Sequence, residues 1–198
     1  MIKLILVAYA LNFQCFVHHV QKASGVEIKK NFTFQHSRQT NPKQIKMFVK
    51  NVWNKGDPNP QVLAISWMES RLRPFVRRGD KGQACGTFQI HARHSYPMFR
   101  RKRGYNGWKP KEYTNKILIN KECRKLEHIA YSLDTLNKYL ALFKKHDKHP
   151  CHHNSGFYGT CNTWYKKRLA YWIDYFQLTK LLCKLPDYAK NAYKSVNK

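Results

Sequence analysis

Apolar residues recur at helical spacing along most of this chain, and no segment of useful length alternates between apolar and polar residues as a β-strand does. The pattern predicts four helices, over residues 41–56, 57–71, 120–145 and 162–185. Residues 74–115 are rich in Gly and Pro, which indicates loops. We therefore expect a mainly α fold with one helical domain over residues 41–185, a linker over residues 26–40 before it and a basic tail over residues 186–198 after it.

The N-terminal residues have the composition of a targeting sequence. A short basic start leads into an apolar run over residues 4–17, and small residues at 23–25 offer a site for a signal peptidase. The run is short for a membrane-spanning helix. We expect residues 1–25 to be an export signal, or an anchor that brings residues 4–17 into contact with a membrane. The alternative is a buried N-terminal helix or strand.

The chain contains six cysteines, an even number that suits disulfide pairing in an oxidising compartment. They are Cys15, Cys85, Cys123, Cys151, Cys161 and Cys183. Removal of a leader would take Cys15 away and leave an odd five. Cys151 and Cys161 bracket a short loop, and we expect this pair to bond. The alternative for the loop is a zinc site, because histidines crowd residues 146–153, but the spacing fits no paired-ligand template, so we expect no metal and no cofactor.

Positive charge dominates the composition: 37 Lys and Arg stand against 11 Asp and Glu, a net charge of +26. Such an excess favours an anionic partner, which could be nucleic acid, an acidic membrane face or the anionic polymers of a bacterial cell wall. Residues 71–103 hold ten of the basic residues against Asp80 alone, with a basic run at Arg100–Arg103 and interleaved aromatic residues that could stack on bases. A cytoplasmic nucleic-acid-binding protein would not need an export-like leader, so we expect no specific nucleic acid partner.

Glu69 stands out among the few carboxylates. At 100° per residue, Val62, Ile65 and Leu72 lie on one helical face. Glu69 falls between the first two of them in projection. A carboxylate on this apolar side is desolvated, which raises its pKa and suits a general acid that holds a proton near neutral pH. The alternative is that the helix ends soon enough for Glu69 to reach water or pair with a neighbouring arginine.

Four short motifs follow one another on this helical scaffold. They are Trp67-Met68-Glu69-Ser70, Gly86-Thr87-Phe88-Gln89-Ile90, His153-Asn154-Ser155-Gly156 and Tyr165. Over residues 43–180 they resemble the catalytic domain of lytic transglycosylases, lysozyme-like enzymes that cleave peptidoglycan between N-acetylmuramic acid and N-acetylglucosamine. That family carries an E-S pair, a G-L-M-Q turn, an A-Y-N-A-G segment and a later tyrosine. The chain departs from it at Thr87, which replaces an apolar residue, and at His152-His153, which replace Ala-Tyr.

The resemblance implies a lysozyme-like helical domain with a loop-rich substrate cleft and one catalytic carboxyl group. Glu69 would protonate the glycosidic oxygen and then, as a carboxylate, take the proton of the muramic acid O6 hydroxyl as O6 closes on C1, giving a 1,6-anhydro sugar. Tyr165 would hold Glu69 by a hydrogen bond. The other substrate-binding residues that it implies are Ser70, Gly86, Phe88, Gln89, Ile90 and Asn154. Simpler roles stay open for several of these residues: a helix end, a packed aromatic or a turn former.

Other functions stay open from the sequence. Asp80 is most simply a turn residue, but in the cleft it could activate a water molecule, and the enzyme would then be a hydrolytic muramidase. A basic nucleic-acid-binding protein and a non-catalytic wall-binding component are the remaining alternatives. As a transglycosylase, the chain would be exported to the periplasm or cell envelope or carried in a phage virion, and would open the wall for a bacteriophage or an envelope-spanning machine. Its partners would be peptidoglycan strands and anionic wall polymers.

Overall fold

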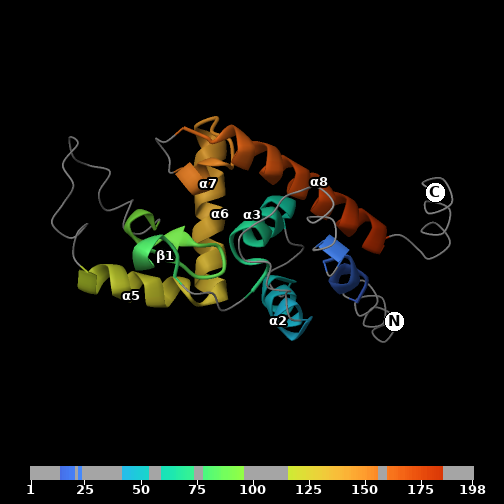
Figure 1. The fold of residues 1–198 in the computed structure, drawn as a ribbon, viewed down its shortest axis with the longest axis horizontal. Coiled ribbons are helices and arrows are strands. Elements are labelled where there is room, and N and C mark those ends of the chain that lie inside the picture. The colour runs from blue at the N-terminus through green and yellow to red at the C-terminus, as the bar shows by residue number, and fades with distance from the viewer. Residues whose placement is uncertain are drawn as a thin grey trace.

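The computed structural model describes residues 14–20, 22–23, 42–53, 59–73, 78–95, 116–155 and 160–184. Helices make up most of these residues (Figure 1), which confirms the mainly α class expected from the sequence. The elements are α2 (Pro42–Trp53), α3 (Pro60–Ser70), η1 (Asp80–Gly82), β1 (Ala84–Cys85), β2 (Ile90–His91), η2 (Ala92–His94), α5 (Lys116–Leu126), α6 (Ile129–Lys145), α7 (His152–Ser155) and α8 (Thr163–Lys184). The predicted linker over residues 26–40, the tail over residues 186–198 and the basic run at 100–103 lie outside the described residues.

Helix α3 lies at the centre of the fold (Figure 1), and most of its residues are buried. Asn59 sets its start, because the Asn59 side-chain oxygen accepts a hydrogen bond from the Gln61 N–H at 2.8 Å, and a proline follows in the first turn. Trp67 packs on Trp172 of α8, with ring centroids 5.3 Å apart. Burial therefore extends beyond the single apolar face expected from the sequence, because α3 packs against both α8 and α6.

The single long helix predicted over residues 120–145 is wrong. The chain forms two helices there, α5 and α6, with a break at residues 127–128. Apolar residues continue at helical spacing across the break, so periodicity does not reveal it. Gly86 lies directly against the carbonyl oxygen of Leu126, the last residue of α5. Beyond this contact the chain turns, so that α5 packs on β1 while α6 packs on α2.

A small hairpin lies between α3 and α5 in the sequence. Its strands β1 and β2 pair antiparallel, with Ala84 opposite His91. Each strand has two residues, too few to show the alternation by which a sequence reveals a strand, so none was predicted. Residues 86–89 form the turn that joins the strands, and a disulfide between Cys85 and Cys123 fastens the hairpin to α5.

The described part of the N-terminal segment, residues 14–20 and 22–23, is helical and lies beside the C-terminal end of α8 (Figure 1). Phe16 is fully buried against Phe176, and a disulfide joins Cys15 to Cys183. This part of the chain matches the third alternative, a buried helix, and cleavage after it would remove one half of the disulfide. No helix among the described residues is long and apolar enough to cross a membrane. An export signal in this region stays a prediction.

All six cysteines are paired in disulfides, and the predicted bond between Cys151 and Cys161 is among them. His149 lies close to both of these sulfur atoms. Because the two sulfurs are bonded to each other, neither offers the thiolate that the zinc alternative requires.

Gly86→Ala should destabilise the protein far more than Gly82→Ala. Both glycines have positive φ, +74° and +86°, so alanine at either position costs about 1 kcal/mol of backbone strain. At Gly86 the new Cβ would also collide with the carbonyl oxygen of Leu126, whereas at Gly82 no atom lies within 4 Å. We expect Gly86→Ala to lower the free energy of unfolding by about 3 kcal/mol or more in urea denaturation. Equal losses in the two variants would show that the contact between the turn and α5 does not support the fold.

Candidate active site

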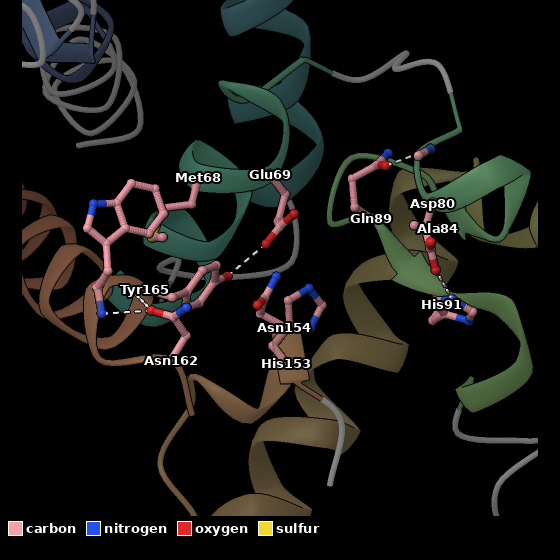
Figure 2. A pocket seen from close by; sticks show the side chains of 12 residues that line it. Met68, Glu69, Asp80, Ala84, Gln89, His91, His153, Asn154, Asn162 and Tyr165 are labelled. Carbon is pink, nitrogen blue, oxygen red and sulfur yellow. Dashed lines mark hydrogen bonds and ion pairs between the residues drawn. The ribbon is translucent and has the colours of Figure 1, made fainter. Parts of the chain in front are cut away.

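A pocket of about 540 Å³ opens where α3, the hairpin, α7 and the start of α8 meet (Figure 2). Helix α3 contributes Glu69, and α8 contributes Trp164 and Tyr165. The hairpin region and α7 supply further polar residues: Asp80, Gln89, His91, His153 and Asn154. The volume is that of a small-molecule site, and its polar groups converge from parts of the chain that are far apart in sequence.

Glu69 and Tyr165, which the resemblance pairs, are hydrogen-bonded: the Tyr165 hydroxyl donates to Glu69 Oε1 at 2.7 Å (Figure 2). Glu69 lies in the last turn of α3, which ends as Arg71 takes a left-handed conformation with φ 58°. Asn162 caps α8 as predicted, since its side-chain oxygen accepts from the backbone N–H groups of Trp164 at 2.8 Å and Tyr165 at 3.3 Å. Two well-defined helix ends therefore hold the carboxyl group and its partner.

The surroundings of Glu69 favour its protonated form. Burial raises the pKa of Glu69 from 4.5 to about 7, because a carboxylate loses solvation in the protein interior. The hydrogen bond from Tyr165 and the positive charge of Arg71 act in the opposite direction, since both stabilise the carboxylate. Desolvation outweighs them, as expected from the sequence. A carboxyl group with a pKa of about 7 can both hold and release a proton at neutral pH, as general acid–base catalysis requires.

Ser70 lies behind Glu69 in the core, not among the residues that line the pocket. Its hydroxyl donates to the Ser66 carbonyl oxygen at 3.0 Å and lies 3.0 Å from the Thr87 hydroxyl. The Thr87 hydroxyl also lies 3.3 Å from the Ser66 hydroxyl. These buried hydroxyls satisfy one another, which accounts for Thr87 where the family has an apolar residue. Ser70 therefore connects α3 to the 86–89 turn, a structural position that does not support its predicted contact with substrate.

Three more of the implied binding residues lie outside the pocket lining: Gly86, Phe88 and Ile90. Phe88 is fully buried, and its ring meets Phe48 of α2 edge-on with centroids 6.1 Å apart. Ile90 is buried in β2, and Gly86 lies against α5. Their positions build the wall of the pocket from behind. Of the implied binding residues, Gln89, Asn154 and Tyr165 line the pocket itself.

Gln89 faces the pocket with its amide group bonded to the backbone. Its Oε1 accepts from the Gly79 N–H at 3.0 Å, and its Nε2 donates to the Gly86 carbonyl oxygen at 2.9 Å. Its φ of 47° is a left-handed conformation that residues other than glycine seldom adopt. Gln89 therefore closes the hairpin, and a sugar that bound its amide would compete with these two hydrogen bonds.

His153 supplies an aromatic ring where the family carries a tyrosine before the motif asparagine. Its Nε2 donates to the Phe88 carbonyl oxygen at 2.7 Å, since a carbonyl can only accept. Burial lowers the pKa of His153 to about 4, so the imidazole is neutral at physiological pH. The ring connects α7 to the 86–89 turn, and the next residue, Asn154, is exposed in the pocket (Figure 2).

Asp80, most simply a turn residue in the sequence, lines the same pocket as Glu69. Its carboxylate pairs with His91 Nε2 at 2.5 Å, and its φ of 45° is again left-handed. Strained backbone of this kind is found most often at functional sites. His91 and Trp164 also line the pocket and were not predicted. The only signal for Trp164 in the sequence is its place next to Tyr165.

Comparison with known proteins adds no family to these observations. No protein-family model matches the chain, and no curated protein or solved structure matches it significantly. Function is therefore inferred from the chemistry of the pocket and from the order of the motifs that build it.

Glu69→Gln should stabilise the protein at alkaline pH and leave its stability unchanged at acidic pH. A carboxyl group whose pKa rises from 4.5 to about 7 on folding contributes fully to stability below pH 4.5, and this contribution is lost as the pH rises through 7. The loss amounts to about 3 kcal/mol, at roughly 1.4 kcal/mol for each pKa unit. Glutamine does not ionise, so the free energies of unfolding of the two proteins, measured in urea, should agree near pH 4 and differ at pH 8.

Asp134→Asn provides the control, because it removes an exposed carboxylate on α6 that lies outside the pocket lining. Its difference from the parent should stay small across the same range. Parallel curves for Glu69→Gln and the parent would instead mean that Glu69 titrates like an ordinary exposed carboxyl group.

Proposed function

We propose that this chain is a peptidoglycan lytic transglycosylase with Glu69 as its only catalytic acid and base. The observation that carries the proposal is the hydrogen bond from Tyr165 to a carboxyl group whose pKa lies near 7, at a pocket large enough for part of a glycan. The order of the motifs supports it as well. Glu69 and Tyr165 are 96 residues apart in the sequence, and Gln89 and Asn154 come between them and line the same pocket.

In the proposed reaction, Glu69 handles both proton transfers. Its carboxylic acid protonates the glycosidic oxygen as the bond between this oxygen and C1 of N-acetylmuramic acid breaks. Its carboxylate then accepts the proton of the O6 hydroxyl while O6 forms a bond to C1. The products are one glycan with a free 4-hydroxyl and one that ends in a 1,6-anhydro ring, and no water is consumed. Tyr165 orients the carboxyl group and stabilises its ionised form between the two steps.

The charge of the pocket favours a neutral glycan over a nucleic acid. None of the described residues that line it is Lys or Arg, although the chain carries 37 of them. Glu69 and Asp80 both line it, and carboxylates would repel the phosphates of a nucleic acid. The surplus positive charge elsewhere suits the anionic polymers that surround peptidoglycan.

A hydrolytic muramidase of the same general architecture is the second candidate, and the position of Asp80 favours it. Two carboxyl groups that flank the scissile bond are the usual arrangement in hydrolysing glycosidases, where one protonates the leaving oxygen and the other can activate water. Asp80 and Glu69 line one pocket, as this mechanism needs. The ion pair between Asp80 and His91, at 2.5 Å, would have to open or be shared before Asp80 could activate a water molecule.

The place of action that we propose is the bacterial cell envelope. Disulfides such as Cys85–Cys123 and Cys151–Cys161 suit an oxidising compartment like the periplasm. Export, or transport inside a phage virion, would bring the enzyme to the wall. A small domain of this kind would open peptidoglycan locally for a bacteriophage or an envelope-spanning machine.

Mass spectrometry of digested peptidoglycan tests the proposal. The parent protein should release fragments that end in 1,6-anhydro-N-acetylmuramic acid, lighter by one water than products of hydrolysis. Glu69→Gln should fold normally and lower turnover by about 10²–10⁴-fold, because the amide has no acidic proton to donate. Asp80→Asn should still give anhydro ends.

Two results would contradict the transglycosylase. Reducing ends in place of anhydro ends, lost on Asp80→Asn, would establish the hydrolytic muramidase. Absence of cleavage by the folded parent would leave a non-catalytic wall-binding protein.

Tyr165→Phe should lower the maximal rate about ten-fold and move the alkaline limb of the pH profile upward. The Tyr165 hydroxyl stabilises the carboxylate, so its loss lets the pKa of Glu69 rise above about 7, and a less well-oriented acid reacts more slowly. Turnover of a soluble glycan against pH measures both effects. Tyr175→Phe is the matched control, because it removes another hydrogen-bonded hydroxyl from α8, one that donates to the His19 carbonyl oxygen. A Tyr165→Phe profile that coincides with the parent would reduce Tyr165 to a packed aromatic.

A further inference from the structure

Trp164 is exposed in a way that the other described tryptophans are not. Trp67 and Trp172 are fully buried, whereas Trp164 is 52% exposed and lines the pocket beside Tyr165. An exposed indole leaves a large apolar surface in water, and a ligand that covers this surface gains free energy. The position next to the residue that holds Glu69 makes the indole a candidate contact for whatever enters the pocket.

The indole of Trp164 is held in a fixed orientation. Its backbone N–H donates to Asn162 Oδ1 at 2.8 Å, at the start of α8. One turn later, Arg168 is 1% exposed, and its Cζ lies 4.4 Å from the centre of the indole ring. Because the guanidinium is buried, it covers the side of the ring that faces the protein. The exposed surface of the indole therefore belongs to the opposite side, which remains free for a ligand.

A rigid, one-sided aromatic surface matches the chemistry of a pyranose ring. A pyranose presents C–H groups on one face, and these pack on an aromatic plane through dispersion and removal of apolar surface from water. Its hydroxyl and acetamido groups point outward from the ring, toward polar neighbours. Asn154 lines the same pocket and offers an exposed amide group for such contacts.

We propose that Trp164 is the stacking platform of a sugar subsite next to Glu69, which takes one N-acetylhexosamine ring of the glycan. This inference rests on the glycan ligand of the proposed function. A nucleobase can also stack on an indole. The carboxyl groups of Glu69 and Asp80 in the same pocket favour the uncharged sugar over a base that brings a phosphate with it.

Calorimetric titration with tri-N-acetylchitotriose, carried out on the Glu69→Gln protein so that no turnover occurs, tests the platform. Adding Trp164→Ala should weaken binding about ten-fold, the effect of losing an aromatic stacking contact. Adding Trp164→Phe should restore most of the affinity. Adding Leu181→Ala should change nothing, since Leu181 is equally exposed, at 52%, on the same helix but about 25 Å away along the helix axis.

NMR on the Glu69→Gln protein gives a readout that does not depend on a Trp164 variant. Nuclear Overhauser contacts between the indole protons of Trp164 and the C–H protons of the bound sugar are expected. The platform would be overturned by unchanged affinity in the folded Trp164→Ala protein, by absence of these contacts, or by binding of a short oligo-dT that depends on Trp164 while the sugar does not bind. The two proposals fail separately: sugar binding that needs Trp164, without any cleavage by the parent, would refute the transglycosylase alone, whereas anhydro products with sugar affinity independent of Trp164 would refute the platform alone.

Discussion

The pocket depends on one close contact, between Gly86 and the carbonyl oxygen of Leu126 at the end of α5. The contact leaves no room for a side chain, so it fixes where the 86–89 turn lies relative to α5. From this position Thr87 bonds to the serines of α3, and the Phe88 carbonyl oxygen accepts from His153 of α7. Three walls of the pocket therefore refer to a single tight turn, and the residues that line it gain their geometry from a segment that lies mostly behind it.

Both departures from the transglycosylase pattern are explained by these bonds. Thr87 is buried where the family carries an apolar residue, and its hydroxyl meets those of Ser66 and Ser70. His153 replaces a tyrosine and donates to the backbone of the turn. Buried polar groups are costly unless they are paired, and here each one has a partner. The chain therefore joins the same segments with polar contacts, and Glu69 and Tyr165 keep their relation.

The site carries features that oppose stability. Glu69 is held where its charged form is disfavoured, so the fold loses free energy as this group ionises. Asp80 and Gln89, at the opposite side of the pocket (Figure 2), both have left-handed backbone conformations. Local strain and unfavourable burial persist in a protein only where the surrounding structure imposes them, as the disulfide and the hydrogen-bonded turn do here. The concentration of such features in one pocket distinguishes it from a chance depression on the surface.

The sequence by itself determined the helical class, the cap at Asn162 and the pairing of Glu69 with Tyr165, because these follow from periodicity, local capping and the order of short motifs. It also indicated that burial would raise the pKa of Glu69. Only the tertiary structure decided where the long helix breaks, and which motif residues face the pocket and which lie behind it. It also brought Asp80 and Trp164 beside the acid. The physical reason is that these features depend on contacts between segments far apart in the chain, such as the turn against α5, and no local pattern records such contacts.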